Sequence, residues 1–293
     1  MELTPRAASW AAIVVNYEAG ALLTECVESL LADRSAGGPP ELVVVDNGST
    51  DGSVDRLLAR EPEARVLHQS VNRGYGGGAN QGTAATAAPV LAVCNPDVRV
   101  RPGTAAAMVD RFDREPDLAA LGPIVLEPDG TPYPSARANP SAVDAVGHAL
   151  LGWCWRTNPF TRRYRQLDAD PRRARDVDWV SGAAIWLRRT ALDAVGGWDE
   201  GYFMYVEDVD LCWRLRRARW RVAYEPAGEV THVQGASTEQ HPYRMVVAHH
   251  RSLLRFASKR WAGWRRVLLV PAALFLSVRA AVLVLARVFR PRS

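Results

Sequence analysis

The chain has 293 residues, of which 48% are hydrophobic and 23% are charged, and this balance excludes a disordered or fibrous protein. Its formal net charge of +4 is unevenly placed. The residues from 240 onward carry eleven of the 36 Arg and Lys side chains and no Asp or Glu, which leaves 25 basic and 32 acidic residues before them. A basic tail of this kind suits an anionic membrane surface or nucleic acid.

The cysteines and the N-terminus indicate a cytosolic compartment. Cys26, Cys94, Cys154 and Cys212 lie in or beside apolar runs and lack the spacing of metal ligands, so we expect reduced residues of the core. The apolar run at 11–15 is too short for a signal peptide, and we therefore expect the chain to begin in the cytoplasm.

Strand and helix patterns alternate through the first 125 residues. Apolar runs predict strands at 11–15, 42–45, 64–67, 90–94 and 118–125. Between them, an apolar stripe from Leu22 to Leu31 predicts a helix, and weaker helical patterns cover 53–60, 78–86 and 103–112. This alternation predicts a doubly wound α/β fold around a mostly parallel sheet.

Polar residues follow four of the predicted strands, where ligands bind in such sheets. These residues are Asn16-Tyr17, Asp46-Asn47-Gly48-Ser49, Asn72-Arg73-Gly74 and Asn95-Pro96-Asp97. The Asp46 carboxylate could accept a hydrogen bond from a base imide or a ribose hydroxyl, or it could cap an Asx-turn. Asp97 could bridge to a divalent cation that holds a diphosphate, or it could cap the following helix.

The glycine-rich stretch "RGYGGGANQG" satisfies the dinucleotide pattern G-x-G-x-x-A with Gly74, Gly76 and Ala79. It follows the third predicted strand, whereas the dinucleotide fingerprint follows the first. We therefore take the glycines only to let the backbone approach some ligand, and a dinucleotide-dependent oxidoreductase stays a weak alternative.

Residues 126–177 are rich in Pro and Arg and lack a sustained period, which is typical of a binding loop or a mobile lid. A strand is predicted at 179–187 and a short one at 221–224. Between these two strands, "YVEDVDLCWRLRRARW" predicts an amphipathic helix with Val209, Cys212, Trp213 and Trp220 on one face.

Three acids, Glu207, Asp208 and Asp210, stand at the start of that helix. They could serve only to complement the helix dipole, since acids favour first turns, or one of them could be a catalytic base. His232, in "EVTHVQGAS", is a lone histidine and becomes a candidate ligand only if the fold brings it to the same metal as Asp97.

The tail has two parts. Residues 245–266 predict a basic helix that ends near Trp261 and Trp264, and residues 267–289 are almost wholly apolar. The apolar part is long enough to span a bilayer, but Arg279 near its centre adds an insertion cost of about 2.5–3.5 kcal/mol. We therefore favour an interfacial or partly inserted helix over a true transmembrane span or a plain helix of the core. The predicted domains are 1–240 and a membrane-associating extension, 241–293.

Taken in order, the motifs resemble the inverting glycosyltransferases of glycosyltransferase family two, which have the GT-A nucleotide-sugar fold. The similar stretches are "IVVNYEAGALLTECVESL", "ELVVVDNGSTDGS", "VNRGYGGGANQG", "AVCNPDV", "VDWVSGAAIWLRR", "GGWDEGYFMYVEDVDLCWRLRRARWRV" and "EVTHVQG". The "NPD" variant and "YVEDVDLCWR" most resemble bacterial rhamnosyltransferases, which use dTDP-L-rhamnose and often act on a polyprenyl-diphosphate-linked sugar.

The resemblance implies a role for each matching residue. Asp208 matches the catalytic base, and Glu207, Trp179 and Ser181 match acceptor-binding positions. Asp46, Arg73, Asn95 and Asp97 match the donor-nucleotide site, and Asp97 with His232 would bind Mg²⁺ or Mn²⁺. Asn95 departs from the family's D-x-D motif, because it replaces the first acid and leaves fewer carboxylates for the metal.

The resemblance also implies partners and a place of action. These are a nucleotide-sugar donor, a lipid-linked saccharide acceptor and, through residues 245–293, the cytoplasmic face of the plasma membrane; the product would serve cell-wall or polysaccharide assembly. An alternative is a nucleotide-sugar-binding protein without catalysis, but such a protein would not need the acids at 207 and 208. Another is a transferase for a different nucleotide sugar. Nucleic-acid binding is not expected, because the basic residues lie beside an apolar segment.

Overall fold

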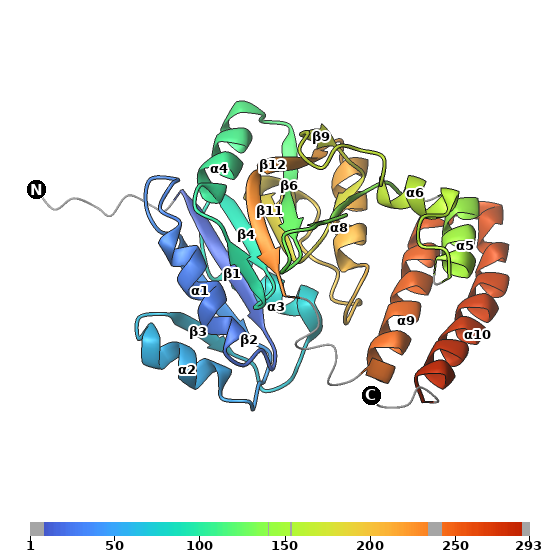
Figure 1. The fold of residues 1–293 in the computed structure, drawn as a ribbon, viewed down its shortest axis with the longest axis horizontal. Coiled ribbons are helices and arrows are strands. Elements are labelled where there is room, and N and C mark those ends of the chain that lie inside the picture. Colours follow the sequence, from blue (N-terminus) through green and yellow to red (C-terminus); the bar gives the residue numbers. More distant parts are fainter. Residues whose placement is uncertain (1–8, 140, 153, 234–241, 289–293) are drawn as a thin grey trace, which may run out of the picture.

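The structure, a computed structural model, describes residues 9–139, 141–152, 154–233 and 242–288 (Figure 1). One large sheet lies at its centre, with strands in the order β3-β2-β1-β4-β11-β6-β12-β5. The strands of this path are β1 (Trp10–Asn16), β2 (Glu41–Asp46), β3 (Arg65–His68), β4 (Val90–Cys94), β5 (Val98–Val100), β6 (Leu118–Leu126), β11 (Ala184–Arg188) and β12 (Arg221–His232).

The first four strands of the path run parallel to one another, and β6 and β12 also form a parallel pair. Strand β11 lies antiparallel between β4 and β6, and β5 lies antiparallel to β12 at the edge. The predicted mostly parallel sheet is therefore confirmed. Short strands complete the sheets: β7 (Pro132–Tyr133) and β9 (Arg175–Asp176) extend the large one, while β8 (Ala136–Arg137) pairs with β10 (Trp179–Val180).

Helices cover both faces of the sheet. The even-numbered residues of β1 pack in one core with α1 (Leu22–Ala32), α2 (Ser53–Arg60) and α4 (Thr104–Arg114). The odd-numbered residues pack in a second core with α3 (Gly74–Ala84), α7 (Arg189–Ala194) and α8 (Glu207–Arg217). Because successive side chains of a strand point to opposite faces, the near-continuous apolar run of β1 supplies both cores.

Helix α3 begins at Gly74, four residues earlier than predicted, so the glycine-rich stretch is part of a helix. A Cβ atom at Gly78 would lie 2.7 Å from Cγ1 of Val15, and one at Gly82 would lie 2.3 Å from Cγ2 of Ile13. These two glycines therefore let α3 pack closely against β1. The expectation that the glycines mainly admit a ligand is wrong at these two positions.

The segment at 126–177 holds more structure than a loop. Ser141 caps α5 (Ala142–Leu151) by accepting a hydrogen bond from the Asp144 N–H, and Asn158 caps α6 (Pro159–Arg165) in the same way through Thr161. These two short helices pack on each other. Three smaller predictions are also corrected: the strand expected at 179–187 is divided into β10 and β11, the one at 221–224 continues to His232, and Cys154 is exposed.

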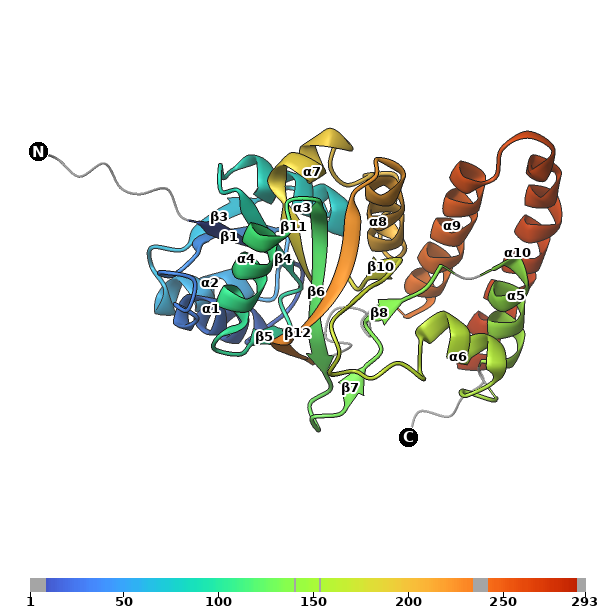
Figure 2. The ribbon, with the colours of Figure 1, turned by 90° about the horizontal axis from the view of Figure 1, so that it is seen from above.

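A helical hairpin forms the C-terminal part. Helix α9 (Pro242–Arg260) is followed by the 3₁₀ turn η1 (Gly263–Leu268) and by α10 (Leu269–Val288), which packs on α9. Figure 2 shows the hairpin beside α5 and α6, at the end of the molecule away from β1 to β3. Within the described ranges, Gly263–Ala286 is the segment long and apolar enough to cross a bilayer, and its most apolar window is not buried.

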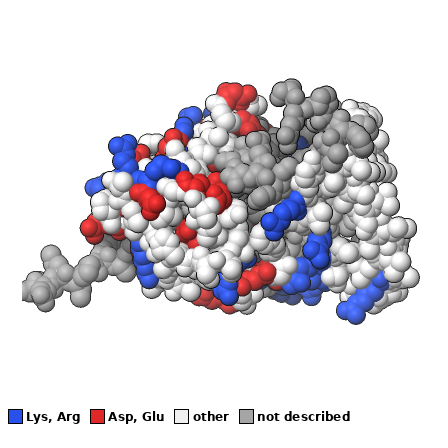
Figure 3. Space-filling model, turned by 90° about the horizontal axis from the view of Figure 1, so that it is seen from below, with Lys and Arg blue, Asp and Glu red and all other residues white. Residues whose placement is uncertain are grey.

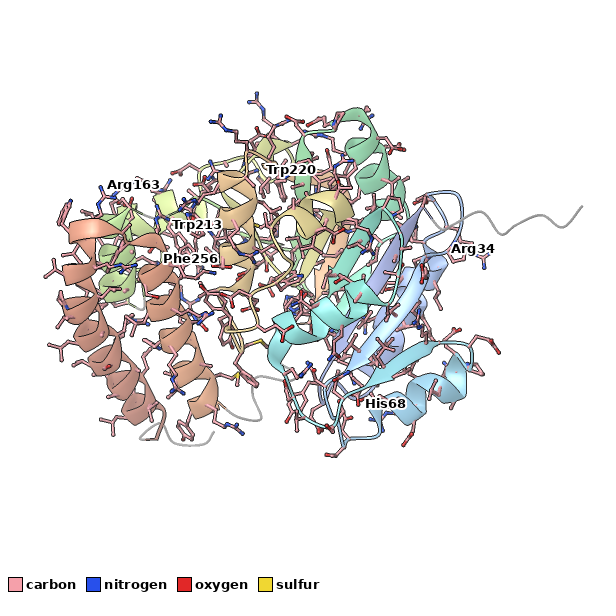
Figure 4. All side chains as sticks on the ribbon, turned by 180° about the vertical axis from the view of Figure 1, so that it is seen from behind. Arg34, His68, Arg163, Trp213, Trp220 and Phe256 are labelled. Atoms are coloured by element: carbon pink, nitrogen blue, oxygen red, sulfur yellow. The ribbon has the colours of Figure 1, made fainter. Side chains whose placement is uncertain are left out.

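Ion pairs hold α9 against the sheet domain. Lys259 Nζ lies 2.8 Å from Asp199 Oδ2 and also contacts Asp210, whose side chain is fully buried. Arg255 pairs with the other oxygen of Asp199 at 2.8 Å. In Figure 4, Trp213 of α8 and Phe256 of α9 lie close together, and their ring centroids are 5.8 Å apart. The hairpin is thus attached directly to α8.

Candidate active site

A cleft of about 1740 Å³ opens between the carboxyl edge of the sheet and the helical hairpin. Single ligands occupy pockets of about 300–1,000 Å³, so this cleft has room for two substrates. Seven of the predicted site residues line it: Asn95, Asp97, Trp179, Ser181, Glu207, Asp208 and His232. They come from strand ends, a two-residue strand and the start of a helix, yet the fold brings them to one cavity.

Strand pairing places His232 beside Asp97. His232 pairs with Val98 in the antiparallel ladder between β12 and β5, which follows Asp97 directly. The His232 Nε2 atom lies 3.0 Å from Asp97 Oδ1 and 3.5 Å from the Asn95 side-chain nitrogen. His232 Nδ1 is buried and has no hydrogen-bond partner in the described part of the chain, where the buried Asp97 Oδ1 atom has no partner other than the His232 ring. Buried polar atoms without partners are costly, so these two side chains are suited to binding a ligand.

Hydrogen bonds hold the Asp208 side chain in place in the first turn of α8. Its Oδ2 atom accepts a hydrogen bond of 2.9 Å from the Gly182 N–H, and its Oδ1 atom accepts one of 2.8 Å from the Val209 N–H. The Gly182 carbonyl accepts a hydrogen bond of 2.6 Å from the Tyr75 hydroxyl. Burial raises the pKa of Asp208, and the hydrogen bonds from Gly182 and Val209 oppose that rise.

Glu207 differs from its neighbour. It is buried, and its Oε2 atom has no hydrogen-bond partner among the described residues. Burial and the charge of Asp208 raise the pKa of Glu207. Two adjacent carboxyl groups do not lose their protons at the same pH, because the first negative charge opposes the second. Asp208 is therefore the member of the pair that ionises first, and Glu207 is the member that keeps its proton to higher pH.

The chain before α8 adopts a rare backbone conformation. Tyr205 and Val206 have φ angles of +67° and +70°, in the left-handed region that side chains other than glycine disfavour. Such residues cost of order 1–3 kcal/mol each and cluster at functional sites. These two residues lead directly into α8, whose first residues, Glu207 and Asp208, line the cleft.

The third acid of this helix has a structural role. Asp210 accepts a hydrogen bond of 2.7 Å from Arg214 Nε, and it also contacts Lys259 of α9. The N-cap residue of α8 is Val206, whose side chain makes no capping hydrogen bond, and within the first turn Asp208 Oδ1 accepts one from the Val209 N–H. Stabilisation of the helix end therefore does not explain all three acids: Asp210 forms a buried ion pair, and Glu207 and Asp208 line the cleft.

Asp46 and Arg73 do not line the cleft. The Asp46 carboxylate is enclosed by its neighbours, since its Oδ1 atom accepts hydrogen bonds from Asn16 Nδ2 at 2.9 Å and from Ser49 Oγ at 2.6 Å. The adjacent Asn47 does line the cleft, and Arg73 is exposed at the start of α3. A part for Asp46 or Arg73 in nucleotide binding stays a prediction.

Trp179 and Ser181 also line the cleft. The Trp179 ring is buried against Tyr164, and the ring nitrogen donates a hydrogen bond of 3.3 Å to the Ala138 carbonyl. The Arg137 guanidinium stacks over Trp179 at 5.0 Å from the ring centre. Neither Arg137 nor Tyr75 carries a clear sequence signal, because Arg137 lies in a segment predicted as a loop and Tyr75 lies within the glycine-rich stretch.

The comparisons with known proteins agree with this geometry. The model of the glycosyl transferase family 2 matches residues 11–196. The chain belongs to glycosyl transferase family 2. It is 39% identical over 265 residues to the N-acetylglucosaminyl-diphospho-decaprenol L-rhamnosyltransferase of Mycobacterium tuberculosis H37Rv, with 87% of this chain and 85% of that relative covered.

Solved structures share the fold of this family 2 chain. The mannosyltransferase PcManGT of Pyrobaculum calidifontis, in complex with GDP-Man and Mn²⁺, has a TM-score of 0.53 at 15% identity and matches 98% of this chain and 77% of its own. GalNAc-T7, with UDP, GalNAc and Mn²⁺, has a TM-score of 0.57 at 13% identity and matches 78% of this chain and 43% of its own. The predicted GT-A fold, the family and an enzyme of the glycosyltransferase class are therefore confirmed.

Proposed function

We propose that the protein is an inverting rhamnosyltransferase that moves L-rhamnose from dTDP-L-rhamnose to a hydroxyl group of a prenyl-diphosphate-linked saccharide in cell-wall assembly. The observation that carries the proposal is that Asp208, Asp97 and His232 line one cleft. The identity of 39% to a rhamnosyltransferase whose name specifies an N-acetylglucosaminyl-diphospho-decaprenol acceptor supports the donor sugar and the lipid-linked acceptor.

Asp208 is the proposed catalytic base. In an inverting transfer, the acceptor hydroxyl attacks the anomeric carbon from the face opposite the departing nucleoside diphosphate. The Asp208 carboxylate takes the hydroxyl proton as the new bond forms, because an unassisted hydroxyl is a poor nucleophile. The hydrogen bonds from Gly182 and Val209 hold the carboxylate in place before the acceptor binds. Glu207, Trp179 and Ser181 are the proposed acceptor-binding residues.

Asp97 and His232 fit a divalent cation, Mg²⁺ or Mn²⁺. They offer a carboxylate oxygen, Asp97 Oδ1, and an imidazole nitrogen, His232 Nε2, which lie 3.0 Å apart, and the Asn95 side-chain nitrogen lies 3.5 Å from the same Nε2 atom. Within the described ranges no group of three or more His, Cys, Asp or Glu side chains is placed to hold a metal. The remaining ligands would therefore be phosphate oxygens of the donor and water, as hard cations prefer. When bound, the cation would neutralise charge on the leaving diphosphate.

The proposed enzyme acts at a membrane surface. Residues 1–240 form the proposed catalytic domain and 241–293 the membrane-associating extension. The apolar segment Gly263–Ala286 supports attachment to a bilayer, where a lipid-linked acceptor resides. We place the enzyme at the cytoplasmic face of the plasma membrane, because the donor would be a soluble nucleotide sugar. Asp46, Arg73 and Asn95 complete the proposed donor-nucleotide site.

The experiment is a transfer assay with the full-length protein in detergent. The acceptor is a synthetic N-acetylglucosaminyl diphospholipid, and the donors are dTDP-L-rhamnose, UDP-glucose and GDP-mannose. We expect transfer from dTDP-L-rhamnose with inversion at the anomeric carbon, read by NMR of the product. Transfer from another donor would overturn the rhamnosyl assignment, and binding of dTDP without any transfer would favour a nucleotide-sugar-binding protein that lacks catalysis.

A further inference from the structure

The part of the cleft that faces the hairpin is basic. The acids of the lining, Asp97, Glu207 and Asp208, lie on the side of the sheet and α8. The remaining lining includes no acid and contains six arginines: Arg137, Arg165, Arg244, Arg260, Arg265 and Arg279. They come from β8, α6, α9, η1 and α10, so segments more than a hundred residues apart bring the same charge to one space.

Arg137 is a buried cation whose hydrogen bonds all go to neutral groups. Its side chain donates to the Tyr133 hydroxyl at 2.6 Å, to the Pro134 carbonyl at 2.7 Å and to the Tyr164 hydroxyl at 3.4 Å. The three rings of Tyr133, Tyr164 and Trp179 surround its guanidinium. The charge of Asp208 acts on Arg137, but the two side chains form no ion pair. A buried charge without a directly bound counter-ion is costly, so this arrangement favours an anionic ligand in the cleft that Arg137 lines.

Arg165 and Arg279 are partly buried and also lack an acidic partner in the described part of the chain. Arg165 forms no ion pair in the described part of the chain, and its buried Nε atom has no hydrogen-bond partner there. Arg279 contacts His250 Nε2 at 2.8 Å and the Ala149 carbonyl at 3.3 Å, both neutral acceptors. Burial lowers the pKa of both arginines. Burial and the charges of Arg165 and Arg137 lower the pKa of His148, between them, to about 4.

The arginines outside the cleft differ. Arg162 and Arg163 share α6 with Arg165, and they pair with Asp168 and Asp144 respectively. Figure 4 shows Arg163 pointing outward at the edge of the molecule. Helix α6 therefore gives its outer arginines acidic partners and leaves its inner arginine without one. An arginine without an acidic partner at the cleft can bind an anion, whereas the outer arginines of α6 are already paired with acids.

The hairpin also brings apolar side chains to the cleft. They are Leu253 and Phe256 of α9, Leu268 of η1, and Phe275 and Leu276 of α10, on the same elements as four of the arginines. In the view of Figure 3 the end of the molecule formed by the hairpin shows white and blue atoms and no red ones among the described residues. The lining of the cleft thus combines acids on the side of the sheet and α8 with arginines and apolar side chains on the side of the hairpin.

We infer that Arg137, Arg165, Arg260 and Arg279 form an acceptor-diphosphate subsite, separate from the place of the nucleotide diphosphate. Its ligand is the diphosphate of a prenyl-diphosphate-linked saccharide, with the sugar toward Asp208 and the prenyl chain along the apolar side chains of the hairpin. The inference rests on the proposed function. Arginine suits this ligand because its planar guanidinium binds phosphate oxygens in pairs and keeps its charge when buried.

The test measures binding to the full-length protein in detergent micelles by titration calorimetry. The probes are geranylgeranyl diphosphate, geranylgeraniol, inorganic diphosphate and dTDP. The variants are Arg165→Gln and Arg260→Gln, and the matched control is Arg162→Gln, on the outer side of α6. We expect each cleft variant to weaken geranylgeranyl diphosphate binding about tenfold or more, as loss of a charge-assisted hydrogen bond does. The affinity for dTDP and the behaviour of Arg162→Gln should not change.

Several outcomes would overturn the inference. Equal affinity of the cleft variants and the wild type for geranylgeranyl diphosphate would remove the subsite. A parallel loss of dTDP affinity would assign the arginines to the donor. Inorganic diphosphate binding as tightly as the lipid would show a free-diphosphate site instead. Unchanged melting temperatures of the variants exclude a folding defect. A wild type that binds the lipid but transfers no sugar would overturn the proposed function alone.

Discussion

The Oδ2 atom of Asp208 accepts a hydrogen bond of 2.9 Å from the backbone N–H of Gly182. The two residues come from different segments, the turn between β10 and β11 and the start of α8, and Tyr75 of α3 holds the same glycine through its carbonyl. Three elements therefore orient one carboxylate. Orientation before binding is what a general base needs, because proton transfer requires a close and aligned acceptor.

Replacing Asp208 by Asn keeps the shape of the side chain and removes the base. We expect the Asp208→Asn variant to lose about 10²- to 10⁴-fold in kcat, while its affinity for dTDP stays that of the wild type. Initial rates and dTDP calorimetry measure the two quantities. Asp193→Asn, at an exposed position of α7, is the matched control and should be fully active. Near-normal turnover of Asp208→Asn would remove Asp208 as the base.

The pH dependence of stability reports on Glu207. Burial and the charge of Asp208 raise the pKa of Glu207, so the folded chain keeps a proton that the unfolded chain releases. The window runs from the ordinary glutamate pKa of about 4.3 up to the raised value. Within it the free energy of unfolding of the wild type falls as pH rises, because the folded state binds more protons.

The Glu207→Gln variant lacks this titration. We therefore expect its free energy of unfolding, relative to that of the wild type, to increase steadily as pH rises through the window. Urea unfolding at several pH values measures the difference. Glu63→Gln, at an exposed position, serves as the control and should show a constant difference. A constant difference for Glu207→Gln as well would mean that Glu207 ionises normally in the folded chain.

The donor set for the cation can be tested without catalysis. We expect His232→Ala to raise the Mn²⁺ concentration needed to increase the melting temperature of the dTDP-bound protein, by tenfold or more, since even outer-shell changes cost about 10- to 100-fold. Asn95→Asp should lower that concentration, because the Asn95 side chain lies 3.5 Å from His232 Nε2 and a carboxylate there adds charge. Unchanged Mn²⁺ dependence in both variants would place the metal elsewhere.

The sequence predicted the sheet well because its strands are continuous apolar runs that end in polar residues. It could not show that His232 meets Asp97, since the ladder between β5 and β12 joins residues 130 to 134 positions apart. The sequence pattern did not predict helices α5 and α6, because each is short and lacks a periodic apolar stripe. Their caps at Ser141 and at Asn158-Pro159 were visible signals that could have located both helices.

Asp210 shows a second limit of sequence reasoning. Its position beside Glu207 and Asp208 made the three acids look alike, but a helix turns by 100° per residue and gives each a different surrounding. Asp210 faces Arg214 and Lys259 in the protein interior, whereas the other two face the cleft. The packing of α9 against α8 separates the structural acid Asp210 from Asp208, the proposed catalytic base.

The outer face of α10 carries the membrane prediction. Val270, Leu274, Val278 and Val282 recur every four residues and are each more than half exposed. Arg279 does not interrupt this stripe, because its guanidinium contacts His250 and Ala149 on the inner side. Arg279, whose charge made insertion of this segment into a bilayer costly, therefore faces the protein. The exposed stripe is suited to burial among lipid chains, with the helix lying on or partly in the bilayer.

We expect the double variant Leu274→Asp and Val278→Asp to bind liposomes at least tenfold more weakly than the wild type, since burial of one such side chain is worth about 1.5–3 kcal/mol. Sedimentation with vesicles that contain anionic lipid measures the partition. Val71→Asp, a change at an equally exposed apolar residue of the sheet domain, should leave it unchanged. Equal partition of the double variant and the wild type would mean that α10 does not contact the bilayer through this face.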